Sequence, residues 1–196
     1  MIRHGKDTDK EILKSIWKYC FPQDSARFIN FYFDRVYVND ETLVYEENGL
    51  PVASMQIIPY LIETGKNILH GGYISGAMTH PDFRKKGYMN KLLLSSFDEM
   101  VGKNYDYAFL IPQEKGLIDM YAKYGFRLCK PAGRRPKNWV VKTSRQWSIV
   151  QQHYFDETGV WLENEPISPN EHKGMIKRLN PAVKEITSLY MGMMLD

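Results

Sequence analysis

One stretch of the sequence, AMTHPDFRKKGYMNKLLLSSF from Ala77, constrains the fold more than any other. It passes from an apolar segment through a proline and three basic residues to a glycine, and then to apolar residues at helical spacing. A helix that begins here leaves backbone N–H groups unpaired and carries partial positive charge at its first turn. The glycine lets a ligand approach the backbone. The stretch therefore predicts a strand, a turn that holds an anion such as pyrophosphate, and a helix; the alternative is a solvated basic loop.

The residues before this stretch predict two helices and a meander of strands. Helical spacing over residues 7–20 and 24–37 predicts the two helices, the first of which Asp7 or Thr8 would cap and the second Asp24 or Ser25. Residues 42–79 read as three antiparallel strands, because the pair Asn48-Gly49 is a strong hairpin signal.

The residues after the stretch predict a parallel unit. A helix from about Gly87 would bury Met89, Leu93, Phe97 and Met100. YDYAFLI then predicts a strand parallel to the one that ends at Thr79. A short helix up to Gly125 and the strand FRLC follow. The fold class expected is α/β (α+β), with a mostly antiparallel mixed sheet flanked by helices, in a single domain over residues 1–196.

The last third of the chain carries weaker signals. WVVKT predicts a strand, HKGMIKRL and LYMGMML predict strands or edge segments, and SRQWSIVQQHYF fits a helix or a strand. The tail from Tyr190 to Asp196 is strongly apolar, so we expect it to be part of the fold.

At RKKGYM and at YAKYGF the chain resembles the GNAT superfamily of acyl-CoA N-acyltransferases. The family's pyrophosphate motif is Arg or Gln, two residues, Gly, one residue, and Gly or Ala. Arg84 and Gly87 match it, whereas Met89 departs from it, and so large a side chain must point away from the phosphates. Large apolar residues stand at that position in the "enhanced intracellular survival" branch, which THPDFRKKGYMNKLL resembles most. The resemblance is good from about Thr42 to Cys129.

The resemblance implies acetyl-CoA as cosubstrate, no metal, and a direct transfer of the acetyl group to a primary amine. It implies that Tyr121, four residues before Gly125-Phe126, protonates the departing thiolate, a sensible role for a weak acid. It also implies that the end of the strand pairs with the pantetheine arm through main-chain groups. The residues expected to bind the cofactor are Ala77, Met78, Thr79, Arg84, Lys85, Lys86, Gly87, Tyr88, Met89 and Asn90.

The general base and the acceptor site stay open in the sequence. His70, Glu63 and the terminal carboxylate of Asp196 are candidates for the base, each with a solvated or structural alternative. The aromatic residues Phe28, Phe31, Tyr32 and Phe33 either wall an acceptor pocket or pack in the core. GRRPKNW is expected to be a solvated loop.

Composition limits the other readings. The net charge of +3 is too small to argue for nucleic acid, and no apolar run reaches the length of a signal peptide core or a membrane span. Cys20 and Cys129 form no metal or disulfide pattern, which favours free thiols in the cytoplasm. The rivals to a transferase are a catalytically silent acyl-CoA-binding domain and a basic nucleic-acid-binding module. The acceptor amine is not encoded in any motif, and a homodimer is left open.

Overall fold

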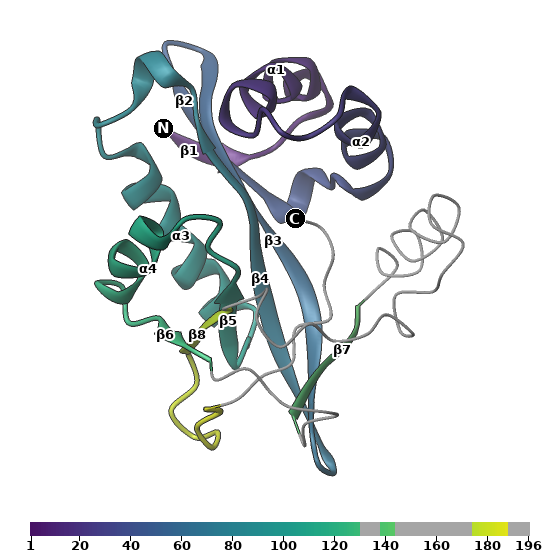
Figure 1. Cartoon of the computed structure of the whole chain (residues 1–196), viewed down its shortest axis with the longest axis vertical. Coiled ribbons are helices and arrows are strands. Elements are labelled where there is room, and N and C mark those ends of the chain that lie inside the picture. Colours follow the sequence, from purple (N-terminus) through teal and green to yellow (C-terminus); the bar gives the residue numbers. More distant parts are fainter. Residues whose placement is uncertain (130–137, 144–173, 188–196) are drawn as a thin grey trace. The chain divides into compact units, whose positions relative to one another are not determined.

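The computed structural model of the chain describes residues 1–129, 138–143 and 174–187 (Figure 1). The helices are α1 (Lys10–Cys20), α2 (Ala26–Phe31), α3 (Tyr88–Gly102) and α4 (Lys115–Ala122), and α2 continues into a π-helical turn at Tyr32–Val36. The strands are β1 (Ile2–His4), β2 (Thr42–Glu47), β3 (Leu50–Thr64), β4 (Asn67–Thr79), β5 (Tyr107–Leu110), β6 (Arg127–Leu128), β7 (Asn138–Thr143) and β8 (Met175–Arg178). None of the helices in these residues is both long and apolar enough to cross a membrane.

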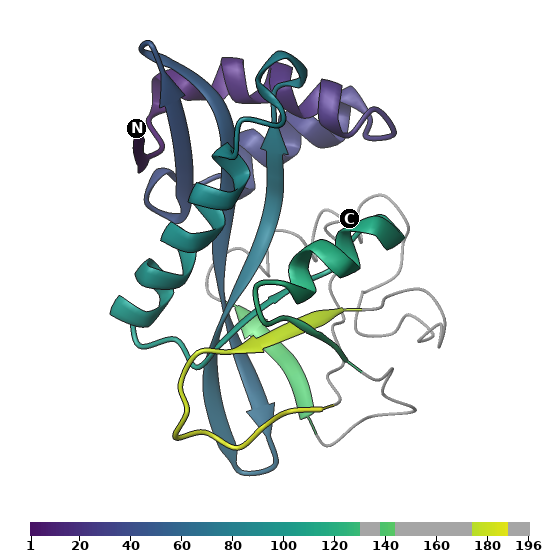
Figure 2. The ribbon, with the colours of Figure 1, turned by 90° about the vertical axis from the view of Figure 1, so that its left-hand side faces the viewer.

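The described strands form one sheet in the order β1-β2-β3-β4-β5-β8-β6, with β7 paired to β3. β4 and β5 run parallel, with Gly71 opposite Tyr107 and Tyr73 opposite Phe109. The pairs β1–β2, β2–β3, β3–β7, β5–β8 and β6–β8 are antiparallel. The expected mixed, mostly antiparallel sheet flanked by helices, with one parallel strand-helix-strand unit, is confirmed (Figures 1 and 2).

Backbone contacts divide the chain into two compact units, which are described one at a time. Unit 1 comprises residues 1–58 and 74–99, and unit 2 comprises residues 59–73 and 100–196. The strands β3 and β4 and the helix α3 each contribute residues to both units. The single domain expected from chain length stays a prediction.

In unit 1 the β2–β3 hairpin turns at Asn48 and Gly49, as the sequence predicts. Both residues have positive φ, +53° and +81°, which is the conformation that this tight turn requires. β1 is an addition that the sequence did not indicate: its three residues pair with Leu43–Tyr45 along the outer edge of β2. A run this short carries no period-2 pattern from which a strand could be recognised.

The two first helices lie where they were expected, but only one has the expected cap. Ser25 caps α2, because its Oγ accepts the amide of Phe28 at 3.1 Å. The expectation for α1 was wrong. Asp7 and Thr8 lie in a 3-10 turn, and α1 begins one turn later at Lys10 without a side-chain cap.

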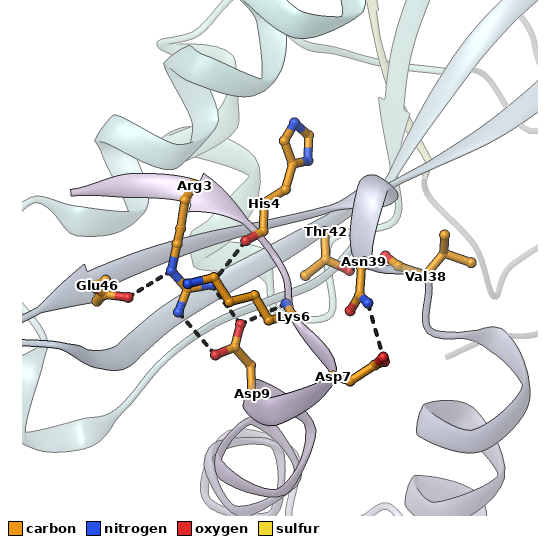
Figure 3. A network of polar contacts seen from close by, with 9 residues as sticks. All are labelled: Arg3, His4, Lys6, Asp7, Asp9, Val38, Asn39, Thr42 and Glu46. Carbon is orange, nitrogen blue, oxygen red and sulfur yellow. Dashed lines mark hydrogen bonds and ion pairs between the residues drawn. The ribbon is translucent and has the colours of Figure 1, made fainter.

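α1 has no side-chain cap because Asp9, the residue before it, serves a different partner (Figure 3). Asp9 accepts two hydrogen bonds from the guanidinium of Arg3, at 2.7 and 3.0 Å, and one from the amide of Lys6 at 2.9 Å. Arg3 also donates from Nε to Glu46 at 2.7 Å. This network joins β1, the 3-10 turn and β2.

The core of unit 1 is aromatic where the helices meet the strands. The ring of Trp17 lies 4.6 Å from that of Tyr32 and 5.7 Å from that of Phe33, between ring centroids. Tyr32 and Phe33 are fully buried, whereas Phe28 and Phe31 keep part of their surface in contact with solvent. The core interpretation is therefore correct for Tyr32 and Phe33.

The core of unit 2 forms around the parallel pair. Tyr73 of β4 stacks on Phe109 of β5 at 5.5 Å, and Tyr60 of β3 meets both rings edge-on. Gly71 permits this approach, because an added Cβ would lie 2.7 Å from the Phe109 ring. The strands expected at WVVKT and within HKGMIKRL are present as β7 and β8. SRQWSIVQQHYF and the tail from Tyr190 lie outside the described residues.

Candidate active site

The turn between β4 and α3 is held by the backbone of unit 1. The amide of His80 donates to the carbonyl of Val52 on β3 at 2.9 Å, and a 3-10 turn at Pro81–Phe83 follows. The chain then takes two left-handed residues, Lys85 at φ +63° and Gly87 at φ +78°. A side chain in the left-handed region is uncommon and is found most often where a site demands it.

Gly87 faces open space. Among the described residues, and apart from its own chain neighbours, no atom lies within 4 Å of the position that a Cβ would take there. The first intrahelical bond of α3 runs from the amide of Lys91 to the carbonyl of Gly87, at 3.1 Å. The amides of Tyr88 and Met89 precede that bond, so helix geometry gives them no partner within α3. Open space above a glycine and amides at a helix start are the features that anion-binding turns share, and the turn with these features is called the cradle below.

The basic side chains of the turn are not equivalent. Arg84 is directed back toward β4, where its Nε donates to the carbonyl of Thr79 at 3.2 Å and its Nη2 lies 3.5 Å from Cys20 Sγ. Lys86 reaches Glu47 of β2 at 3.4 Å and lies over the ring of Phe83. Lys85 is exposed and comes from the left-handed position beside the glycine.

The amide of Tyr88 is part of the cradle, whereas its side chain packs against β2. Its ring stacks on Tyr45 at 4.1 Å and its hydroxyl donates to Glu47. The hydrogen bond to Glu47 raises the pKa of Tyr88 to about 12 and lowers the pKa of Glu47. This support could not be predicted from the sequence, because about forty residues separate the two partners in the chain.

The last residues of β4 extend beyond the part of the strand that is described as paired with β5. That register covers Gly71–Tyr73, whereas Ala77, Met78 and Thr79 come after it. Between the two segments, Gly76 lies within the strand at φ +56° and packs against Trp17. The side chain of Met78 is buried, while Ala77 and Thr79 are half-buried. A strand end that leaves its neighbour exposes main-chain donors and acceptors.

Tyr121 lies in unit 2, in the last turns of α4, and is buried. Its ring meets that of Phe126 edge-on at 5.7 Å, and its carbonyl accepts the amide of Tyr124 at 2.9 Å. Gly125 ends the turn at φ +85°, as expected. Burial raises the pKa of Tyr121 to about 12, so the phenol carries its proton throughout the physiological range.

The structure separates the candidates for the base. His70 is exposed near the start of β4, where its amide donates to Asp106 at 2.9 Å. Glu63 is exposed on β3 beside the β3–β4 turn. Asp196 lies outside the described residues, as do residues 133–137 of the GRRPKNW segment.

An apolar hollow of about 340 Å³ lies beside the turn in unit 1, and the sequence did not predict it. Residues of α1, of the start of β3 and of the loop before Arg84 line it, among them Tyr19, Leu50, His80 and Phe83. His80 meets the rings of both Tyr19 and Phe83 edge-on. The hollow therefore adjoins the same loop that carries the cradle.

The sequence profile described as "Acetyltransferase (GNAT) domain" matches residues 1–129, which hold both the cradle and Tyr121. The chain belongs to this GNAT family. No curated protein matches its sequence.

Solved structures share the GNAT fold at low sequence identity. A GCN5-related N-acetyltransferase from Anabaena variabilis has a TM-score of 0.58 at 16% identity, over 66% of this chain and 32% of that one. Eis1 from Mycobacterium abscessus has a TM-score of 0.57 at 14% identity, over 69% and 37%. Rv2747 from Mycobacterium tuberculosis, solved in complex with CoA, has a TM-score of 0.56 at 12% identity, over 91% and 98%. The chain thus covers about a third of the length of the first two.

Proposed function

We propose that this GNAT chain is an acyl-CoA-dependent N-acyltransferase that moves an acetyl group from acetyl-CoA to a primary amine. The observation that carries the proposal is the cradle at Gly87, where a left-handed glycine with free space above it stands at the start of α3. Its shape and donors suit a pyrophosphate.

The residues of the cradle fit the cofactor. The amides of Gly87, Tyr88 and Met89 would hold the pyrophosphate, and Lys85 would supply charge. The side chain of Arg84 bonds to the carbonyl of Thr79, so it holds the turn in place more than it extends toward the proposed pyrophosphate. Main-chain groups of Ala77, Met78 and Thr79 would pair with the pantetheine arm, as the family resemblance implies. Lys86 and Asn90 complete the proposed binding set.

Acetyl-CoA supplies an activated thioester. In the proposed reaction the neutral amine attacks the thioester carbonyl directly, and an amide of the β4 end steadies the oxyanion. The C–S bond then breaks as Tyr121 donates its proton to the departing sulfur. The proton that the amine nitrogen loses passes through water to the phenolate and restores Tyr121. The raised pKa of the buried Cys129 supports direct transfer rather than transfer through a cysteine of the protein. Burial raises the pKa of Cys129 to about 11, so it is a poor thiolate nucleophile at neutral pH.

The neighbours support the cofactor and leave the acceptor open. Rv2747 was solved with CoA, which favours CoA as ligand here. The match to Eis1 is in line with the "enhanced intracellular survival" branch, which we propose on the motif THPDFRKKGYMNKLL. Both cysteines are free, which is in line with the proposed cytoplasmic location.

Two measurements test the proposal. Calorimetry with CoA tests binding, and release of free thiol from acetyl-CoA in the presence of n-propylamine, spermidine, an aminoglycoside and a peptide with a free N-terminus tests transfer. We expect binding together with amine-dependent thiol release. Binding without turnover on any amine would favour the alternative, a catalytically silent acyl-CoA-binding domain. Absence of CoA binding would exclude both.

A further inference from the structure

A buried chain of hydrogen bonds crosses the core of unit 1 and ends on β4. Tyr32 donates its hydroxyl proton to Gln56 Oε1, and Gln56 Nε2 donates to Thr42 Oγ1 at 3.1 Å. Thr42 Oγ1 donates to the carbonyl of Val38 at 2.8 Å. At the other end, Tyr32 Oη lies 3.3 Å from Ser75 Oγ. The four side chains are all at least nine-tenths buried.

The backbone carbonyl at the end of this chain of hydrogen bonds determines which atom donates in each of them. A carbonyl can only accept, so Thr42 must donate to Val38 and must therefore accept from the Gln56 amide. The carbonyl oxygen of Gln56 then faces Tyr32, which must donate its single proton there. Ser75 is consequently the donor in its contact with Tyr32, and its lone pairs are left to accept.

This chain cannot store a proton. Its members are a phenol, an amide and two hydroxyls, and it ends on a backbone carbonyl, so it has no group that takes up a proton near neutral pH. A role as general base is therefore excluded for it. What it can do is orient Ser75 Oγ as an acceptor and polarise it, because linked hydrogen bonds strengthen one another.

Ser75 stands at a significant place on β4. It follows Tyr73, where the described pairing with β5 ends, and it precedes the left-handed Gly76. The segment proposed to pair with the pantetheine arm, Ala77 to Thr79, begins two residues later. An acceptor oriented at this point suits a donor that arrives at the thioester end of the cofactor.

We propose that Ser75 Oγ accepts an N–H hydrogen bond from the attacking amine, and that Tyr32 is a positioning residue that keeps Ser75 in its accepting orientation. The proposal rests on the proposed N-acyltransferase function and adds a residue that recognises the amine. Ser75 is not the base in this proposal: it orients the amine, and the proton that the nitrogen loses passes through water.

The test compares Ser75→Ala, Tyr32→Phe and Tyr37→Phe with n-propylamine, whose only hydrogen-bonding group is its nitrogen. Tyr37→Phe is the control, because Tyr37 is buried in the same aromatic core, where it stacks on Phe33, and its hydroxyl lies beside Thr42, at the end of the chain remote from Ser75. Ser75→Ala and Tyr32→Phe should each lower kcat/KM for the amine by about 3- to 10-fold, the usual effect of one neutral hydrogen bond. The dissociation constant of CoA, measured by calorimetry, should stay unchanged in all three.

The outcomes are distinct. Unchanged amine kinetics in folded Ser75→Ala and Tyr32→Phe would overturn this inference and leave the proposed function intact. So would an equal loss in Tyr37→Phe, since that would show a general effect of the core. A wild-type protein that binds CoA but acetylates no amine would overturn the proposed function and this inference with it. A double variant, Ser75→Ala with Tyr32→Phe, should lose no more than Ser75→Ala alone.

Discussion

Arg3 and Asp9 form a bidentate ion pair in which both partners are largely shielded from water (Figure 3). Burial alone would raise the pKa of the Asp9 carboxyl, but the hydrogen bonds from Arg3 and from the amide of Lys6 outweigh it and lower the pKa. The pair joins β1 to the turn before α1, in addition to the backbone pairing of β1 with β2. Removing one partner leaves the other charge uncompensated.

Replacing Arg3 with Met should therefore lower the free energy of unfolding by about 3 kcal/mol. Chemical denaturation followed by circular dichroism measures this. Because the folded pKa of Asp9 is below the unfolded value of about 3.9, its contribution is present above that pH and is lost as pH falls through the folded pKa. The difference between Arg3→Met and the wild type should shrink in the same range.

The matched control is Lys14→Met. Lys14 pairs with Glu11 and Asp34, whose side chains are exposed, and such pairs contribute no more than about 1 kcal/mol. Equal losses in the two variants would show that the Arg3–Asp9 pair has no special weight.

Gly76 provides a second test, because it combines a left-handed backbone with a close neighbour. An Ala at this position would place its Cβ 2.8 Å from the Trp17 ring, at φ +56°. Trp17 cannot easily retreat, since its Nε1 donates to Asp24 at 2.6 Å. Gly76→Ala should cost about 2–4 kcal/mol, from backbone strain and overpacking together.

Gly49→Ala is the control, because it introduces backbone strain without a close contact. Gly49 has φ +81° and no atom within 4 Å of its added Cβ, so the loss should be about 1 kcal/mol. If both variants lose the same stability, the contact with Trp17 is not what Gly76 preserves.

These two residues also show what the sequence could and could not predict. Gly49 was placed correctly because Asn-Gly between two apolar alternations is a local signal, and the cap at Ser25 and the start of α3 were local as well. Gly76 looked like any strand glycine, since its partner Trp17 is nearly sixty residues away. The bonds from Tyr32 to Gln56 and Ser75 depend on three segments meeting, which no periodicity reveals. Local chemistry thus predicted the turn and the helix start at Gly87, and tertiary packing determined what surrounds them.

A substitution at Gly87 should affect cofactor binding far more than folding. Gly87→Glu places a negative side chain where the pyrophosphate is proposed to lie, so like charges meet there. The left-handed backbone at φ +78° adds strain of about 1 kcal/mol, as at Gly49, which the fold should tolerate. CoA affinity measured by calorimetry should fall by at least roughly 100-fold, since such a juxtaposition costs several kcal/mol. Gly65→Glu is the control, because Gly65 is also left-handed with no atom within 4 Å. Equal affinity in the two variants would refute the assignment of the cradle.

Lys177 should stabilise the end of α4 that carries Tyr121. Its Nζ donates to the carbonyl of Tyr124 at 2.6 Å, and burial lowers its pKa. Lys177→Met should lower the melting temperature and reduce kcat, while the affinity for CoA is kept. Lys123→Met, an exposed change at the same helix end, should do neither.

The pH dependence gives an independent signature of Lys177. Because its pKa is lower in the folded than in the unfolded chain, the unfolded chain binds more protons between the two values. The free energy of unfolding should therefore rise as pH increases toward the ordinary lysine value of about 10.4. Lys177→Met should lack this rise, and a variant that keeps it would show that another group is responsible.

Tyr121 is the residue on which the chemistry of the proposal turns. Tyr121→Phe keeps the edge-on contact with Phe126 and removes only the acidic proton. If that proton reaches the departing thiolate, kcat should fall by about 10²- to 10⁴-fold while CoA affinity is kept. The pKa of about 12 adds a condition: Tyr121 stays protonated well above neutral pH, so it should impose no alkaline limb on the wild-type kcat profile below about pH 11. A limb near pH 9 that disappears in Tyr121→Phe would mean that the phenol ionises far more easily than its buried position implies. A variant with near-normal kcat would mean that water protonates the thiolate, and Tyr121 would then be a packing residue of α4.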